Sequence, residues 1–305
     1  MILFLTRKLS GSADILMKIF SQRHISVFRL NLDMFDQYQF QWGNDGFSIS
    51  NSLNLSIDSC KIKVIICYKG LISIDEYTDF EETHIETKYI KSWLNCLYHD
   101  IVKFGYQNKH IRFWTPWEHI FPKVYQMNIA QRYFNVPDYL LHWGKELPSK
   151  NVVCKTLTSR PLENRNYVYV KKVNQNQLDI SYPWFTQNVA TGNRDATVLY
   201  INGKVHCFQF ATERGNLTDW RVTQGTEANQ WSPWDAGKEF EEKIDLYMKD
   251  MGLKYGRLDF IIGGREPQFL EVNPTGQFGW LDDENLTLHN EVVDAILDPS
   301  STITL

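Results

Sequence analysis

The sequence lacks a hydrophobic run long enough to cross a membrane. Its apolar beginning, MILFLTRK at residues 1–8, is far shorter than the ~20 apolar residues that a membrane-spanning helix needs. It also lacks the layout of a signal peptide, in which a charged segment precedes an apolar one. We therefore expect a cytoplasmic protein with no membrane partner, in which residues 2–5 form a first strand.

An excess of basic residues is also missing. Lys and Arg number 32 against 36 Asp and Glu, a formal net charge of −4, so the overall balance does not indicate a nucleic-acid partner. The five cysteines are odd in number and form no CxxC or Cys/His zinc pattern, which favours reduced, buried thiols. With 305 residues, 43% of them hydrophobic, the chain is long enough for about two domains of ordinary size.

Hydrophobic periodicity predicts an α/β arrangement in the first third of the chain. A strand at 2–5, a helix at 11–20 and a strand at 25–30 give a β-α-β start. Apolar positions then predict strands at residues 47–49, 53–57 and 63–67 and a long helix at about 86–104. We assign residues 1–118 to this N-terminal domain.

The remaining residues mix helices with strands typical of antiparallel sheets. Apolar positions at helical spacing predict a helix over 123–134, ending before Pro137. Asn202-Gly203 favours a tight hairpin turn within 197–210. The other expected elements are strands at 152–156 and 167–173 around a candidate lid at 159–166, a helix at 236–251 closed by Gly252, and a loose tail at 298–305.

Two apolar strands near the C-terminus carry a candidate metal site. Residues 258–262 and 268–272 are separated by five turn-forming residues, which predicts a hairpin. If Ile262 pairs with Gln268, Asp259 lies opposite Glu271, and two carboxylates ~5 Å apart repel each other unless a cation lies between them. Asn273 returns to the same face by strand periodicity and offers a carbonyl oxygen. Oxygen ligands of this kind suit Mg²⁺.

An ordinary hairpin with two solvent-facing acidic residues is the alternative interpretation of Asp259 and Glu271. The apolar strands around them indicate burial instead, and the NPTGQ stretch that follows Val272 forms a rigid turn beside the proposed cation. Lys155 supports a charged site, because an ammonium inside an apolar strand needs an anion, and an ATP phosphate would supply one.

Several motifs together resemble one known family. They are Asp259, Glu271-Val272-Asn273-Pro274 followed by Gly276-Gln277-Phe278, Lys123-x-x-Gln126 followed by Asn135-Val136-Pro137, Lys155 on its strand, residues 183–189 and Asp219-Trp220-Arg221. This set resembles the ATP-grasp ligases, and the NPTGQF form is similar to the microviridin-type macrocyclases that make graspetides. The likeness covers about residues 120–297.

The resemblance implies a fold and an activity. The fold would be α/β (α+β), an ATP-grasp fold with a pre-ATP-grasp domain at 1–118, a central small domain at 119–190 and a C-terminal antiparallel-sheet domain at 191–305 that holds the metal. The activity would be ATP-dependent ligation, in which Asp or Glu carboxylates of a ribosomally made precursor peptide become acyl phosphates and close ester or amide rings. The cofactors would be ATP and Mg²⁺, and the partner a precursor peptide with a leader segment. Ester or amide product and homodimer formation stay open.

Site residues follow from the same resemblance, residue by residue. Metal ligation falls to Asp259, Glu271 and Asn273. Contacts to the nucleotide fall to Lys123, Lys155, Gln187, Asn188 and Val189, and contacts to phosphate or acyl phosphate to Arg221 and Arg257. Two positions depart from the family's pattern. The residue two places after Asp195 is Thr197 instead of arginine, so that the arginine is either lost or replaced by Arg194, and Asn188 stands where many members have glutamate.

Two other functions remain open at this point. One is an ATP-grasp ligase that joins two separate molecules, such as an amino-acid or glutamate ligase, which a precursor peptide encoded beside the gene would argue against. The other is a nucleotide-binding module without ligase activity. The intact set of two acids and an amide argues against that module, because a degenerate site is expected to lose a metal ligand.

Overall fold

The computed structural model describes residues 1–68, 85–115, 122–143, 152–155, 157, 171–173, 178–179, 181–211, 213 and 231–301. The chain divides into two compact units. Unit 1 comprises Met1–Ile120, Gly252–Tyr255 and Pro274–Leu305, and unit 2 comprises Phe121–Met251 and Gly256–Asn273. The three-part division with boundaries near residues 118 and 190 stays a prediction.

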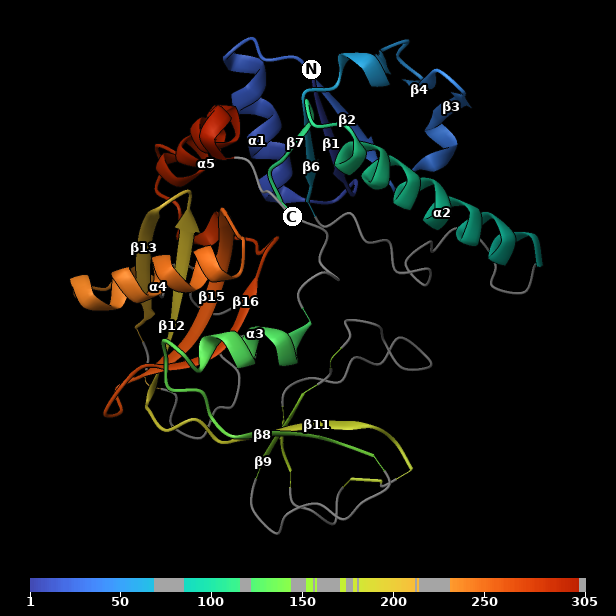
Figure 1. Cartoon of the computed structure of the whole chain (residues 1–305). Coiled ribbons are helices and arrows are strands. Elements are labelled where there is room, and N and C mark those ends of the chain that lie inside the picture. The colour runs from blue at the N-terminus through green and yellow to red at the C-terminus, as the bar shows by residue number, and fades with distance from the viewer. Residues whose placement is uncertain are drawn as a thin grey trace. The chain divides into compact units, whose positions relative to one another are not determined.

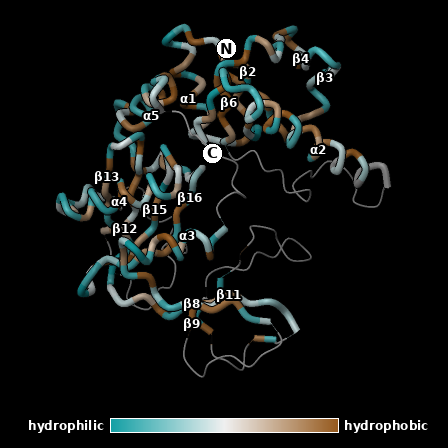
Figure 2. The backbone as a smooth tube through the Cα atoms, in the orientation of Figure 1, coloured by the Kyte–Doolittle hydropathy of each residue, from teal (hydrophilic) through white to brown (hydrophobic). Residues whose placement is uncertain are grey.

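Unit 1 is built on a parallel sheet that confirms the expected β-α-β start. Its strands have the order β2-β1-β6-β7 and run in parallel. Their bounds are β1 Ile2–Thr6, β2 Val27–Asn31, β6 Val64–Cys67 and β7 Arg112–Phe113. Every residue of β1 and β6 is buried, as is typical of parallel strands covered on both faces. Figure 2 shows hydrophobic residues along β6.

Three helices in the described part of unit 1 lie beside this sheet (Figure 1). Helix α1 spans Gly11–Gln22, α2 spans Ile85–Gln107 and α5 spans Thr287–Leu297. Helices α1 and α5 pack against each other, and Arg23, the residue that follows α1, donates hydrogen bonds to Asp294 and Asn290 of α5. The C-terminal helix is therefore part of the same unit as the N-terminal strands.

A small antiparallel sheet in unit 1 corrects one predicted strand. Its strands are β3 Tyr38–Gly43, β4 Gly46–Asn51 and β5 Ser56–Asp58. The expected strand at 53–57 begins only at Ser56, because Asn51 accepts the backbone N–H groups of residues 53 and 55 and Asn54 adopts a φ of 59°. Asparagine favours such turns because its short side chain can bond the nearby backbone.

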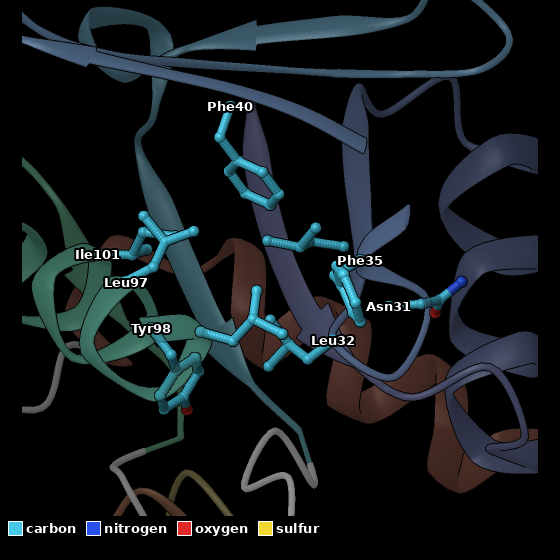
Figure 3. A pocket seen from close by; sticks show the side chains of 9 residues that line it. Asn31, Leu32, Phe35, Phe40, Leu97, Tyr98 and Ile101 are labelled. Atoms are coloured by element: carbon cyan, nitrogen blue, oxygen red, sulfur yellow. The ribbon is translucent and has the colours of Figure 1, made fainter. Parts of the chain in front are cut away.

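Unit 1 also contains an apolar pocket between β2 and α2. Figure 3 shows side chains of both elements, and of the short helix between β2 and β3, converging on it. The residues around it include Leu32, Phe35, Phe40, Leu97 and Tyr98. Because no described residue lining this pocket is charged, we assign it no part in catalysis.

Unit 2 contains two antiparallel sheets. The smaller has the order β10-β9-β11-β8 and the larger the order β14-β13-β12-β15-β16. Their bounds are β8 Tyr139–His142, β9 Val152–Lys155, β10 Lys171–Val173, β11 Trp184–Asn188, β12 Arg194–Ile201, β13 Lys204–Phe210, β14 Trp231–Pro233, β15 Tyr255–Ile262 and β16 Gln268–Asn273. The predicted hairpin is confirmed: Asn202 and Gly203, which join β12 to β13, have φ values of 45° and 95°, as this tight turn requires.

Unit 2 also contains helices α3 and α4, with bounds Lys123–Ala130 and Lys238–Asp250. Helix α3 ends earlier than predicted, and a turn follows it in which Phe134 donates its N–H to the carbonyl of Ala130. The predicted closure of α4 is confirmed by Gly252, whose φ is 66°. Aromatic rings form the core between α4 and the larger sheet, including Phe134, Phe240, Tyr247, Phe260 and Phe269.

Short 3-10 helices lie at Phe35–Gln37, Ser59–Lys61, Gly279–Leu281 and Pro299–Ser301, so the loose tail predicted from residue 298 is ordered at its beginning. The candidate lid at 159–166 and residues 167–170 of a predicted strand lie outside the described residues. No helix in the described part of the chain has the length and apolar character to span a membrane.

Candidate functional site

The hairpin of β15 and β16 holds the predicted metal ligands in the expected register. Asp259 pairs with Glu271 and Arg257 pairs with Asn273. The predicted pairing of Ile262 with Gln268 is wrong, because Gln268 pairs with Ile261 instead. A β-bulge after Asp259 shifts the register by one residue, so the prediction holds on the side of the hairpin that carries the candidate ligands.

The bulge separates apolar from polar side chains on β16. Without it, strand periodicity would place Phe269 on the same face as Glu271 and Asn273, since these residues are two positions apart. The extra residue, Leu270, moves Phe269 to the opposite face, where its ring lies 5.6 Å from that of Phe260. An apolar ring thus packs in the core while the polar residues share the other face.

Asp259 is held by side chains from three strands. Thr197 on β12 lies with its hydroxyl 3.0 Å from Oδ1 of Asp259, and Arg257 donates to Oδ2 at 3.1 Å. Asn273 donates its amide N–H to the same Oδ2 at 3.3 Å, which leaves its own carbonyl oxygen as the atom that could bind a cation. The carboxylate therefore has a fixed orientation within the site.

Glu271 is paired with a lysine from helix α3. Nζ of Lys123 lies 3.0 Å from Oε2 of Glu271, and both side chains are largely buried, with exposed fractions of 28% and 21%. Burial raises the pKa of Glu271, but the positive charges of Lys123, Lys155 and Arg257 outweigh burial and lower this pKa to about 2. The carboxylate is thus ionised at neutral pH and ready to bind cations.

Helix α3 is fixed against β16 by Gln126, a residue of the Lys123-x-x-Gln126 motif to which the sequence assigned no role. Oε1 of this buried side chain accepts the backbone N–H of Val272 at 3.1 Å. On the same strand, the backbone N–H of Phe269 donates to the backbone carbonyl of Asn135 at 2.9 Å. A helix places residues three apart on one side, so Lys123 and Gln126 both reach β16. That spacing is the signal that could have predicted the role of Gln126.

The predicted nucleotide residues of the smaller sheet lie on β9, β11 and the link that follows. Lys155 pairs with Phe185 and Val153 pairs with Gln187, so Lys155 and Gln187 share one face. Gln187 is buried and lies 4.0 Å from Sδ of Met127 on α3. That face is therefore directed toward the helix that carries Lys123.

Asn188 connects β11 to the segment before β8. Its backbone N–H donates to the carbonyl of Asp138 at 2.7 Å, and its amide donates to the Asp138 carboxylate at 3.0 Å. A carboxylate thus lies beside the position where glutamate was expected. Val189 follows directly and is half-buried.

Thr197 stands where the family's pattern has an arginine, and Arg194 does not take the place of that arginine beside Asp259. Thr197 is buried and occupies that position, in contact with Asp259. Strand alternation places Arg194 on the opposite face of β12 from Thr197, and Arg194 contacts Gln209 and Glu213 instead. Arg257 is the described arginine that touches Asp259. Arg221 lies outside the described residues.

The chemistry of the donor set fits a hard divalent cation. Two carboxylates and an amide oxygen are the ligands that Mg²⁺ prefers. No cluster of three or more His, Cys, Asp or Glu side chains that could hold a metal occurs among the residues placed in the structure, so a metal bound at this site would take an amide oxygen as its third protein ligand. The surrounding lysines and arginine add positive charge, which suits a ligand that brings phosphate groups.

Comparisons with known proteins identify the fold. No protein-family model matches the sequence, and no curated protein matches it. Among solved structures, the macrocyclase MdnC of Microcystis aeruginosa MRC, bound with precursor peptide MdnA, has a TM-score of 0.78 at 17% identity over 97% of this chain and 99% of its own. A RiPP-associated ATP-grasp ligase of Chryseobacterium gregarium, in complex with ADP and a leader and core peptide, has a TM-score of 0.77 at 17% identity over 100% and 99%.

A more distant match extends this result. D-alanine–D-alanine ligase of Bacillus anthracis, complexed with ATP, has a TM-score of 0.51 at 11% identity, covering 97% of this chain and 95% of its own. The chain therefore has the ATP-grasp fold, with an antiparallel C-terminal sheet as the sequence predicted.

Proposed function

We propose that this protein is an ATP-dependent ligase that closes macrocycles in a ribosomally made precursor peptide. The observation that carries the proposal is the polar face of β15 and β16, where Asp259, Glu271 and Asn273 lie together within reach of Lys123 and Arg257. Such a face can hold a metal–triphosphate, and it belongs to an ATP-grasp fold. ATP and Mg²⁺ are the cofactors of this proposal.

The proposed reaction has two steps. A side-chain carboxylate of Asp or Glu in the peptide attacks the γ-phosphorus of ATP, so that an acyl phosphate forms and ADP leaves. A Ser or Thr hydroxyl, or a Lys amine, then attacks the acyl carbon, and phosphate leaves as the ester or amide forms. No protein side chain needs to become a covalent intermediate, because positioning and charge stabilisation supply the catalysis.

The metal site would consist of Asp259, Glu271 and Asn273. Bound Mg²⁺ would neutralise charge on the phosphates. Thr197 and Asn273 orient the Asp259 carboxylate through the hydrogen bonds described above. Lys123, on α3, would neutralise charge on the transferred phosphoryl group.

Three further cations complete the proposed phosphate environment. Lys155 shares the electrostatic surroundings of Glu271, and Arg257 contacts Asp259. Arg221 is proposed for the same task on the resemblance of the Asp219-Trp220-Arg221 motif alone. Gln187, Asn188 and Val189 would line the adenine, with the backbone as the main contact because the Gln187 side chain is buried against Pro137 and Met127.

A peptide substrate is favoured over two separate small molecules. The likeness is greater to the two peptide-bound ligases, with TM-scores of 0.78 and 0.77, than to the D-alanine–D-alanine ligase at 0.51. The NPTGQF motif points in the same direction. We therefore propose a precursor peptide with a leader segment as the partner, and leave homodimer formation to a measurement of mass in solution.

The test is the mass of a candidate precursor after incubation with enzyme, ATP and Mg²⁺. Loss of one water per bond formed, with one ADP released for each, would support intramolecular condensation. A gain in mass equal to an amino acid less one water would favour the ligase that joins two molecules. ADP release with free amino acids and none with any peptide would refute the macrocyclase proposal.

A further inference from the structure

A linker at residues 189–193 joins β11 of the smaller sheet to β12 of the larger sheet in unit 2. Its residues 191–193 are exposed, so little packing of its own fixes its backbone. A backbone that contacts a ligand needs a fixed conformation, because ordering a loose segment on binding costs affinity. The contacts that hold this linker therefore bear on the nucleotide site proposed above.

A buried side chain from β16 holds the middle of the linker. Oε1 of Gln268 accepts the backbone N–H of Thr191 at 2.5 Å, and Gln268 is 8% exposed. The strand fixes Gln268 itself, since this residue pairs with Ile261 and forms a backbone bridge with Asn135. The acceptor is thus held in place before any ligand binds.

The turn between β15 and β16 lies directly against the same linker. Asn193 donates its backbone N–H to the carbonyl of Ile262 at 3.0 Å. A Cβ on Gly264 would lie 2.7 Å from the carbonyl oxygen of Thr191. One on Gly192 would lie 2.5 Å from the carbonyl oxygen of Ile262. Only glycine permits so close an approach of two backbones, so the linker follows the hairpin that carries the candidate metal ligands.

We propose that Gln268 is a positioning residue for the base of the nucleotide and that it acts through the linker. Its amide oxygen fixes Thr191, so the backbone keeps one conformation just beyond Val189. The inference rests on the proposed function for the adenine nucleotide and its contact with the segment around Val189. It adds that β16 serves both ends of that nucleotide, because Gln268 lies at the start of the strand and the candidate metal ligands near its end.

A purely structural hydrogen bond is the alternative. Its loss would leave the N–H of Thr191 without this acceptor and would lower stability, but it would not change which base the site prefers. A positioning role does change that preference, since only a linker in one conformation presents fixed donors and acceptors to a base. The preference between two bases is therefore the measurement that separates the two roles.

The test compares Gln268→Met with the wild type in binding the adenine analogue AMPPNP and the guanine analogue GMPPNP, each with Mg²⁺, by calorimetry. Methionine has a similar length and lacks the acceptor. The affinity for AMPPNP should fall about tenfold, because the linker must then be ordered on binding. The affinity for GMPPNP should change less than about twofold, because the ordered linker does not match that base.

The controls concern folding and the substitution itself. Thermal melting of each variant checks its folding. If Gln268→Met does not fold, Gly264→Ala tests the same linker, because it displaces the carbonyl of Thr191 while Gln268 stays intact. Gln131 lies at an exposed position after α3, so Gln131→Met makes the same change elsewhere in unit 2 and should alter neither affinity.

The outcomes separate this inference from the proposed function. If the wild type binds no AMPPNP, both fall. If the wild type binds AMPPNP, but the folded Gln268→Met variant keeps that affinity or weakens both analogues by the same factor, Gln268 is only structural and the inference is overturned while the proposed function stands. Equal affinities of the wild type for the two analogues would also overturn it, because the linker would then select no base.

Discussion

The three cations around Glu271, which are Lys123, Lys155 and Arg257, should together stabilise unit 2 by an amount that can be derived from the Glu271 pKa. The Glu271 pKa falls from 4.5 to about 2, and a shift of that size corresponds to about 3 kcal/mol of stabilisation of the ionised form in the folded state. Since the folded pKa lies below the unfolded value, the stabilisation is complete above about pH 4.5 and is lost as the pH falls toward 2.

Two substitutions and their combination test this value at pH 7. Glu271→Gln should lower the free energy of unfolding by about 3 kcal/mol, because it removes the negative charge that Lys123, Lys155 and Arg257 stabilise. Lys123→Met should lower it by only about 1 kcal/mol, since Glu271 keeps two other cations. The double variant should lose about 1 to 2 kcal/mol less than the sum of the single losses, because the partners interact directly.

The assay is urea denaturation of the wild type and the three variants, followed by far-UV circular dichroism without nucleotide. A loss of this size leaves most proteins folded at room temperature. Losses that add within about 0.5 kcal/mol would refute the reasoning, because independent sites behave in that way. The single Glu271→Gln variant should also lose stability less steeply than the wild type below about pH 4.5, because the contribution of Glu271 to that slope is absent.

Three other predictions concern turnover, substrate and pH. Asp259→Asn should reduce ADP release with precursor peptide at least about 100-fold while the protein stays folded, with a lowered melting temperature, because a candidate metal ligand and ion-pair partner of Arg257 loses its charge but almost no volume; near-normal rates at saturating Mg²⁺ would contradict the metal assignment. A core peptide without its leader should bind much more weakly than the full precursor in calorimetry, and equal affinities would argue against leader recognition. In unit 1, burial lowers the pKa of His289 more than its contact with Asp282 raises it, so stability should fall as the pH drops below about 6.5. That slope should be weaker in His289→Asn, and thermal melts from pH 7.5 to 5.5 would detect its persistence.

The sequence predicted the strongly periodic elements and the strand register beside the candidate metal ligands. Alternation placed Asp259 opposite Glu271 because their strands are apolar and the turn between them is short. It could not predict the bulge, since the pairing of Phe260 with Phe269 depends on aromatic rings from α4 and the α3 turn. Local pattern carries no information about partners so distant along the chain.

Other residues of the site depend on tertiary contacts in the same way. The sequence identifies Thr197 only as a substitute for an expected arginine. Its contact with Asp259 could not be predicted, because it depends on β12 lying beside β15 in the sheet. Helix α3 was predicted too long because the apolar positions continue to Phe134, which packs in the core from a turn after the helix. The strand predicted to begin at residue 53 begins only at Ser56, because the Asn51 side chain accepts hydrogen bonds from the backbone N–H groups of Leu53 and Leu55.

The bulge at Leu270 has a consequence for comparing this chain with distant relatives. A relative that lacks the bulge has one residue fewer between its core phenylalanine and the glutamate that corresponds to Glu271, so a gap-free alignment that matches Glu271 would set Phe269 against a residue of the opposite face. A single-residue gap at Leu270 restores the match on both sides. Substitution patterns on either side of that position should therefore be scored as separate segments, each with its own inward and outward positions.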